Sequence, residues 1–159
     1  LSTVYGIYSG YELCENAALP GKEEYLDSEK YEIKVRDWLA PGNIVDIITR
    51  INQIRQESAA LQIYNDVLFI ATTNPQILAY AKMTDDRSDV ILCVVNLDPH
   101  HKQAALLDIP LDAFGIAADE QYQAHDLLSD ERYRWQGPTA YVELGPPSKM
   151  AHIIKIRRW

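Results

Sequence analysis

The strongest constraint on the fold is a series of short, strand-like segments that begins near residue 67 and continues to the end of the chain. Residues 90–95 are continuously apolar, which is typical of a central strand covered on both faces. Clusters of Gly, Pro, Asn, Asp and Ser separate the segments. The expected strands are 67–71, 76–82, 89–97, 103–107, 121–126, 132–135, 139–144 and 151–156. Short strands at a spacing of roughly ten residues predict a mainly β fold, an antiparallel β-sandwich.

The first part of the chain has a different pattern. Residues 3–8 are β-branched and aromatic, as in a strand inside a sheet, and residues 12–34 predict a long loop, a kind of segment that is often functional. Asn43 is placed to cap a following amphipathic helix. The apolar stripe of that helix is formed by Ile44, Ile47, Ile48, Ile51 and Ile54. We therefore divide the chain into residues 1–63 and 64–159.

Composition excludes several classes of protein. The chain has 159 residues, of which 47% are hydrophobic and 24% charged, so it is not a disordered polypeptide. A net charge of −8 argues against an extended surface for nucleic acid or anionic lipid, and no apolar run is long enough to span a membrane. Two cysteines, Cys14 and Cys93, cannot build a disulfide framework or a four-cysteine zinc site. The expected location is the cytoplasm.

Few residues offer catalytic chemistry. Glu12 and Glu15 resemble the carboxylate pair of a glycosidase, but a structural role, with backbone amides or with Lys30 or Arg36 as partners, is the better interpretation. Residues 98–101 and 85–89 are expected to be exposed turns rather than metal sites. His125, Asp126 and His152 lack a nucleophile, because Cys93 lies in an apolar strand where a thiolate is disfavoured.

Other residues could bind sugars. Lys30 and Tyr31 combine a charged donor with an aromatic face, the two groups that hold sugar hydroxyls and a pyranose ring, although a solvated turn is the simpler interpretation of the residue types. Tyr5, Tyr8 and Trp38 could stack on sugars, but packing is the favoured role. A strip of exposed aromatic residues on the sandwich would indicate glucan binding, but most are expected to face inward. The candidates for that strip are Tyr122, Tyr133, Trp135 and Tyr141.

Several segments carry a resemblance to a known family. Residues 5–16 (YGIYSGYELCEN), 28–38 (SEKYEIKVRDW) and 41–44 (PGNI) resemble the maltosyltransferases of the α-amylase clan, glycoside hydrolase family 13. Residues 51–61 are similar to the last barrel helix of the clan, and residues 94–101 to a strand of its trailing sandwich domain.

The resemblance implies that residues 1–63 are the last strand, loop and helix of a (β/α)8 barrel and that residues 64–159 are its C-terminal β-sandwich. It implies a retaining transfer of maltosyl units from maltose 1-phosphate to the non-reducing end of an α-1,4-glucan. The catalytic residues are then expected upstream of Leu1, which leaves none in this chain and makes it inactive alone. Lys30 and Tyr31 match the pair that contacts the maltosyl donor. No metal, cofactor, nucleic acid or membrane is implied.

Alternatives remain open at this point. An α-glucan hydrolase or a trehalose-forming isomerase of the same clan would share much of the pattern, although residues 28–38 favour transfer. A non-catalytic glucan-binding or structural sandwich module is the third option. Because the chain starts at Leu1 on a strand-like stretch, we expect it to be the C-terminal piece of a longer protein. One strand and one helix cannot close a barrel. Residues 1–40 are therefore expected to be displaced or poorly ordered, or held by a homo-oligomer contact.

Overall fold

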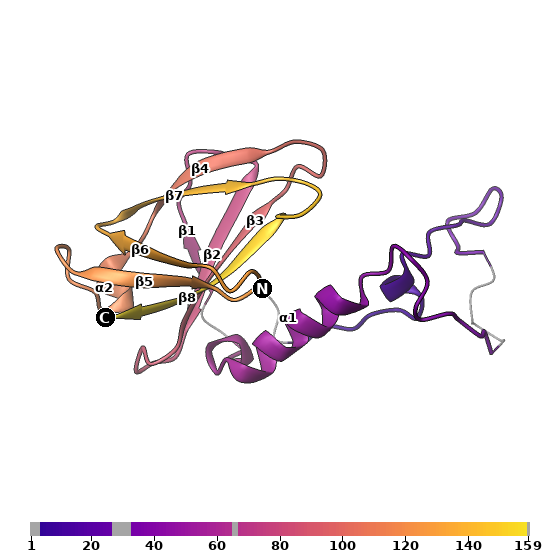
Figure 1. Ribbon diagram of the computed structural model, residues 1–159, viewed down its shortest axis with the longest axis horizontal. Helices are drawn as coiled ribbons and strands as arrows, with labels where there is room; N and C mark the ends of the chain where they lie inside the picture. The colour runs from indigo at the N-terminus through magenta and orange to yellow at the C-terminus, as the bar shows by residue number, and fades with distance from the viewer. Residues whose placement is uncertain (1–3, 27–32, 65–66, 159) are drawn as a thin grey trace. The chain divides into compact units, whose positions relative to one another are not determined.

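The structure is a computed structural model that describes residues 4–26, 33–64 and 67–158 (Figure 1). The chain divides into two compact units, Ser2–Gln53 and Ile54–Trp159. We call them the loop unit and the sandwich unit and describe each by itself. Helix α1 (Val45–Glu57) runs from one unit into the other. The division of the chain at residues 63 and 64 therefore stays a prediction.

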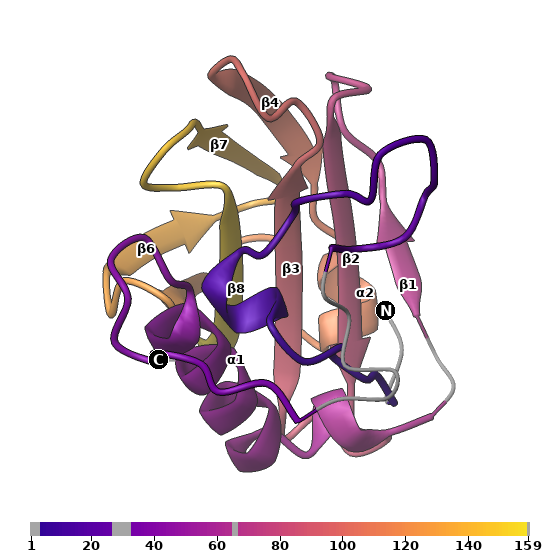
Figure 2. The ribbon, with the colours of Figure 1, turned by 90° about the vertical axis from the view of Figure 1, so that its right-hand side faces the viewer.

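The sandwich unit is built from antiparallel strands, as predicted (Figures 1 and 2). Its larger sheet has six strands in the order β1-β2-β3-β8-β5-β6, and a smaller sheet pairs β4 with β7. Every pairing within the two sheets is antiparallel. The strands are β1 (Leu68–Ile70), β2 (Ile77–Met83), β3 (Val90–Asn96), β4 (Gln103–Asp108), β5 (Gln121–Asp126), β6 (Arg132–Gln136), β7 (Thr139–Leu144) and β8 (Ala151–Arg158). Each of the eight predicted segments thus overlaps one of these strands, with ends that differ by at most two residues.

The core lies between the two sheets. Alternate residues of each strand point into it, because successive side chains of a strand face opposite sides of the sheet. Leu92 of β3, Ile154 of β8 and Leu144 of β7 are at most 1% exposed in this core. The short helix α2 (Leu111–Phe114) closes one end, with Leu111 and Phe114 both buried in the core. The two sheets join at one edge, where Thr72 bridges to Leu107.

Strand β3 is covered on both faces, as its continuous apolar run predicted. On the face away from the core, Ile91 and Cys93 pack with Ala60, which lies in the short 3-10 helix η2 (Ala60–Gln62). Burial raises the pKa of the Cys93 thiol. The thiolate is therefore disfavoured, in agreement with the sequence interpretation.

The loop unit holds the N-terminal part of α1 and the segments before it. The side chain of Asn43 accepts a hydrogen bond from Val45 N at 3.1 Å, which confirms the predicted cap. Residues 4–8 form no strand, because the described residues provide no neighbouring strand to pair with them. A 3-10 turn, η1 (Tyr11–Leu13), follows. No helix in the described part of the chain is long and apolar enough to cross a membrane.

Three carboxylates of the sandwich unit should make its stability depend on acid pH. Hydrogen bonds from Thr84 and Ser88 lower the pKa of Asp86 from 3.8 to about 2. Hydrogen bonds, of which that from the backbone of His100 is the main one, lower the pKa of Asp98 from 3.8 to about 2. A hydrogen bond from Lys149 is the main cause that lowers the pKa of Glu131 from 4.5 to about 2. Each folded pKa lies below the usual value, so each contribution is complete above about pH 4.5 and is lost as the pH falls to 2.

The expected result is a free energy of unfolding that decreases between pH 5 and pH 2, measured by urea denaturation followed by circular dichroism. In Glu131→Gln the same decrease should be smaller, because that carboxylate no longer takes up a proton on unfolding. An identical pH dependence in both proteins would contradict the role of Glu131.

Candidate functional site

The two residues predicted to bind sugar, Lys30 and Tyr31, lie outside the described residues. Their role therefore stays a prediction, and the candidate site is built from the segments that lead into and out of them. The incoming segment is a small hairpin in which Ala18 bridges to Tyr25. Its ladder includes hydrogen bonds from Leu26 N to Ala17 O at 2.7 Å and from Leu19 N to Glu24 O at 2.8 Å. This hairpin fixes the position of Tyr25 in the loop unit.

The outgoing segment is held by the carboxylate of Glu15. Arg36 Nε donates to Glu15 Oε1 at 3.1 Å, and Lys34 Nζ donates to Oε2 at 3.2 Å. The hydrogen bond from Arg36 is the main cause that keeps the pKa of Glu15 below its usual value. Arg36 also donates to the backbone oxygen of Ser9 at 3.4 Å, and its side chain is only 4% exposed. One carboxylate thus ties together the two ends of the loop.

Glu12 and Glu15 therefore have the structural roles that the sequence favoured. Glu12 Oε2 accepts a hydrogen bond from Gly10 N at 3.2 Å, and Arg36 is the predicted partner of Glu15. Gly10 has a φ of 94°, and a side chain there would overlap the Glu15 carboxylate. The sharp turn at Gly10 is thus what brings Glu15 against Arg36.

Three tyrosines surround this ion pair. Tyr8, Tyr11 and Tyr25 line a small pocket of about 40 Å³ together with Glu15 and Arg36. The three tyrosines are 54%, 58% and 52% exposed, respectively, and the rings of Tyr8 and Tyr25 stack with centroids 6.4 Å apart. We call these three side chains the tyrosine platform. The sequence favoured packing for Tyr8 and did not single out Tyr11 or Tyr25.

A signal for this platform was nevertheless present in the sequence. Five of the ten tyrosines fall within the first 40 residues, in a segment with few aliphatic residues to pack against. Tyr5 and Trp38, the other aromatic residues considered for stacking, are 47% and 50% exposed. Aromatic residues that a small core cannot bury are candidates for ligand contact.

An apolar groove of about 450 Å³ lies on another side of the loop unit. Tyr5, Ile7, Tyr8 and Tyr11 line it together with four isoleucines of the predicted stripe, Ile44, Ile47, Ile48 and Ile51. Tyr5 Oη donates a hydrogen bond to Asn52 Oδ1 across this unit. Ile47 and Ile51 of the stripe remain 57% and 38% exposed, whereas Ile54, in the sandwich unit, is buried.

The four aromatic residues considered as a glucan-binding strip of the sandwich unit do not form an exposed strip in the described part of the chain. Tyr122 is fully buried, donates to Gly137 O at 3.0 Å and packs edge-on against Trp135. Tyr133 and Trp135 are half-buried against the core, and of these four residues only Tyr141 is well exposed, at 60%. The expectation that most of these side chains face inward is confirmed.

Three histidines of the sandwich unit, His101, His125 and His152, contact carboxylates. Asp126 pairs with the buried His152 at 2.8 Å, and His125 pairs with Asp130 at 2.5 Å. His101 contacts Asp98 at 3.0 Å in an exposed turn. The described residues hold no group of three or more His, Cys, Asp or Glu side chains that could bind a metal ion.

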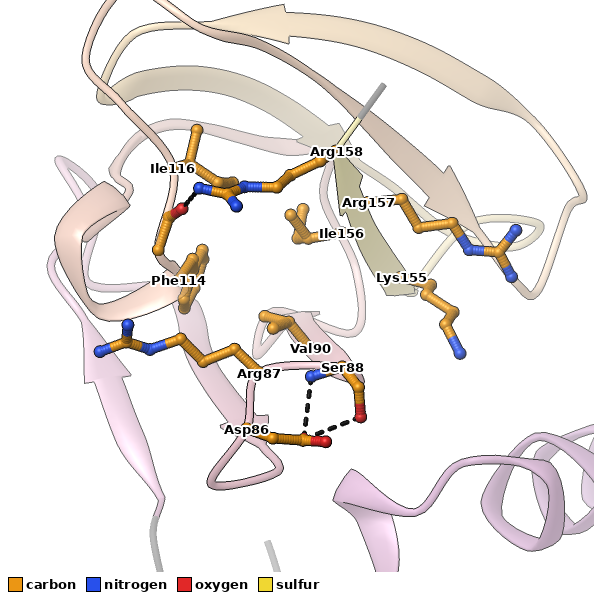
Figure 3. Close-up of a pocket in the computed structure, with 11 residues that line it drawn as sticks. Asp86, Arg87, Ser88, Val90, Phe114, Ile116, Lys155, Ile156, Arg157 and Arg158 are labelled. Carbon is orange, nitrogen blue, oxygen red and sulfur yellow. Dashed lines mark hydrogen bonds between the residues drawn. The ribbon is translucent and has the colours of Figure 1, made fainter.

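A larger pocket, of about 720 Å³, opens beside α2 at one end of the sandwich (Figure 3). Val90, Phe114 and Ile156 form an apolar floor, and basic side chains surround it. Figure 3 shows that these do not converge: Arg87 points to one side of the pocket, and Lys155 and Arg157 point to the other. Arg158 donates to the backbone oxygen of Gly115, and Lys155 pairs with Asp89. This geometry presents no single point at which an anion would be bound.

The fold of the chain is similar to parts of two solved α-amylase structures. A maltogenic alpha-amylase from Thermotoga neapolitana matches 96% of the chain with 32% of its own length, at a TM-score of 0.64 and 16% identity. An Anoxybacillus alpha-amylase matches 96% of the chain with 28% of its length, at the same TM-score and 14% identity. The chain belongs to the family described as "GLGE, C-terminal", whose family model matches residues 69–156.

Curated relatives share much more sequence. A protein from Rhodospirillum rubrum named alpha-1,4-glucan:maltose-1-phosphate maltosyltransferase is 49% identical over 156 residues, which cover 98% of this chain and 23% of the relative. Proteins of the same name from Myxococcus xanthus and Pseudomonas aeruginosa are 46% and 45% identical over 99% of this chain and 24% of their own lengths. The chain thus spans about a quarter of the length of the curated relatives it matches.

Proposed function

We propose that this chain is the C-terminal part of a maltosyltransferase. The whole protein would transfer maltosyl units from maltose 1-phosphate to the non-reducing end of an α-1,4-glucan, with retention of the anomeric configuration. The observation that carries this proposal is the identity of 41–49% to proteins of that name, which covers 91% or more of the chain. The matched region includes the loop unit, where residues 5–16 and 28–38 carry the resemblance to maltosyltransferases, and not only the sandwich.

We further propose that residues 1–63 complete a (β/α)8 barrel and that residues 64–159 are its trailing sandwich domain. The order of a strand-like stretch, a long loop and the helix α1 supports this assignment. In such barrels the loops that follow the strands form the active site. The segment between residues 9 and 42 would therefore face the substrates, and the apolar groove would pack against the rest of the barrel.

The chemistry would be divided between the two parts of the protein. In a retaining transfer, a carboxylate attacks the anomeric carbon and releases phosphate, and a glucan hydroxyl then displaces that carboxylate while an acid/base residue takes its proton. These groups are expected outside this chain. Lys30 would donate hydrogen bonds to the hydroxyls of the maltosyl donor, and Tyr31 would pack along the sugar ring. The free thiols of Cys14 and Cys93 support a cytoplasmic location.

The proposal is tested with the full-length protein and maltose 1-phosphate. Phosphate release that requires an α-1,4-glucan and lengthens it by two glucose units would support transfer. Release of free maltose from glucan without the phosphate donor would indicate a hydrolase, and conversion of maltose to trehalose would indicate an isomerase. Either result, without donor-dependent elongation, would contradict the proposal.

Lys30→Ala in the full-length protein is expected to raise the KM for maltose 1-phosphate by about tenfold or more, because a charged hydrogen bond to the donor contributes about 1.5 kcal/mol or more. The measurement is phosphate release at varied donor concentration and saturating glucan. Lys22→Ala is the matched control, since Lys22 is an exposed lysine in the turn of the hairpin that precedes Lys30. Equal kinetics in Lys30→Ala and Lys22→Ala would remove Lys30 from the donor site.

A further inference from the structure

We propose that the tyrosine platform, Tyr8, Tyr11 and Tyr25, binds the α-glucan acceptor chain. This inference rests on the proposed function. It assigns the neutral acceptor glucan to residues other than Lys30 and Tyr31, which are proposed to bind the donor. It concerns the loop unit alone, and each residue that carries it is described by the structure.

The first argument is exposure. A tyrosine ring has a large apolar face and a polar end, which suits it to contact the carbon-bound hydrogens of a sugar while its hydroxyl stays in water. Tyr8, Tyr11 and Tyr25 each expose about half of their surface around one small pocket. The stack between Tyr8 and Tyr25, with ring planes 23° apart, gives two nearly parallel faces. Such faces can contact a flexible chain without further ordering of the protein.

The second argument is the polar group at the base of the pocket. Sugar sites need a few fixed donors and acceptors among apolar side chains. The Arg36 side chain is almost fully buried and held by Glu15 and Ser9, while the Glu15 carboxylate is 33% exposed and can accept a sugar hydroxyl. Arg36, which lines the pocket, and Lys34 beside it both pair with Glu15, so the polar group that the pocket offers to a ligand is the carboxylate, which suits the hydroxyls of a neutral glucan better than the phosphate of the donor.

The third argument is size. The cavity of about 40 Å³ has little more than the space that one water molecule occupies in the liquid, so a sugar ring cannot enter it. A ligand must instead lie across the three tyrosines at the rim. An open surface of this kind suits a polymer that is bound, extended and moved along, because no enclosed end limits its length.

Tyr25 is the residue that distinguishes this proposal from simple packing. Tyr8 and Tyr11 also line the apolar groove, so their loss would disturb the packing proposed for the rest of the barrel. Tyr25 lines the small pocket but not the apolar groove. The backbone hydrogen bonds of the hairpin between Ala17 and Leu26 hold it there. Its side chain can be removed without breaking that ladder.

The test uses the full-length protein and maltoheptaose as the acceptor. Tyr25→Ala is expected to raise the KM for maltoheptaose by about fivefold to tenfold, the effect of one lost aromatic contact. The KM for maltose 1-phosphate should stay within about twofold of the wild-type value. The midpoint of thermal unfolding should stay within about 2 °C of that of the wild type. Tyr25→Phe should restore most of the acceptor affinity, because it keeps the ring. Tyr64→Ala, an exposed tyrosine of the sandwich unit at 78% exposure, is the matched control and should change neither KM.

Three results would overturn the inference. One is an unchanged KM for maltoheptaose in Tyr25→Ala. Another is an equal rise in both KM values, which would show that Tyr25 positions the donor loop. The last is a large loss of thermal stability with an unchanged acceptor KM, which would show packing. If the wild type transfers no maltosyl units, the proposed function fails separately. In that case, calorimetric titration of the wild type and of Tyr25→Ala with maltoheptaose tests the tyrosine platform by itself. Weaker binding by Tyr25→Ala than by the wild type would support the platform. Equal binding by the two proteins, or no binding by the wild type, would overturn it.

Discussion

Replacing Asp126 by alanine is expected to lower the free energy of unfolding of the chain by about 2–3 kcal/mol, the cost of removing a buried carboxylate that accepts several hydrogen bonds. Asp126 lies at the end of β5, with its side chain 1% exposed, and pairs with His152 of β8 at 2.8 Å. Its carboxylate also accepts a hydrogen bond from Ser129 Oγ at 2.8 Å and from Leu128 N at 3.2 Å. In the alanine variant the buried His152 loses this acceptor, at a cost of about 1–3 kcal/mol, whereas Ser129 is exposed and Leu128 is half-buried, so their donors can still reach water.

The pH dependence of this variant gives a second measurement. Burial by itself raises the pKa of Asp126, but the hydrogen bonds from His152 and Ser129 outweigh it and hold the pKa below its usual value of 3.8. The contribution of Asp126 is therefore present above pH 3.8 and is lost as the pH falls through the lower, folded pKa. Urea denaturation should show a large difference between wild type and Asp126→Ala at pH 7 that shrinks towards pH 2.

Asp130→Ala is the matched control. Asp130 also pairs with a histidine, His125, but its side chain is 68% exposed, so its loss should change stability by at most about 1 kcal/mol. Equal effects of Asp126→Ala and Asp130→Ala would contradict the view that burial of the Asp126–His152 pair makes it important.

The strands of the sandwich could be predicted because their signal is local. Alternation, or a continuous apolar run as in residues 90–95, marks a strand wherever it pairs, and turn residues mark its ends. The arrangement of the strands could not be predicted in the same way. The placement of β8 between β3 and β5, and the separation of β4 and β7 into a second sheet, depend on contacts between residues far apart in the sequence. The strand-like stretch at residues 4–8 shows the opposite case, in which a local preference forms no strand without a neighbour.

The candidate site, too, could be predicted from the sequence only in part. The pairing of Glu15 with Arg36 was predicted as one of several partners, because charge alone limits the choice. The contribution of Tyr25 could not be predicted, since it depends on the hairpin that returns Tyr25 towards Tyr8 and on the turn at Gly10. Residue type identifies aromatic and charged groups, but only the folded loop shows which of them meet.

Asp89 is the residue for which sequence reasoning failed most clearly. It ends a run of turn residues, 85–89, that was predicted to be exposed, and residues 85–88 are exposed while Asp89 is only 6% exposed. Its Oδ2 accepts hydrogen bonds from Ser58 Oγ at 2.5 Å and from Ala60 N at 3.1 Å, and its Oδ1 pairs with Lys155 Nζ at 2.7 Å. One carboxylate thus fastens the segment that follows α1 to strands β3 and β8 of the sheet.

Asp89→Ala is therefore expected to lower the free energy of unfolding by about 2–3 kcal/mol, because Ser58 and Ala60 N lose a buried acceptor while Lys155, at 22% exposure, can still reach water. Asp89→Asn keeps an acceptor for Ser58 and Ala60 N and should lose less. Asp85→Ala, an exposed aspartate of the same hairpin, should change stability by no more than about 0.5 kcal/mol. Urea denaturation of the three variants should give the order Asp89→Ala, Asp89→Asn, Asp85→Ala from largest to smallest effect. If Asp89→Ala were as stable as Asp85→Ala, the carboxylate would not be what fastens the segment after α1 to the sheet.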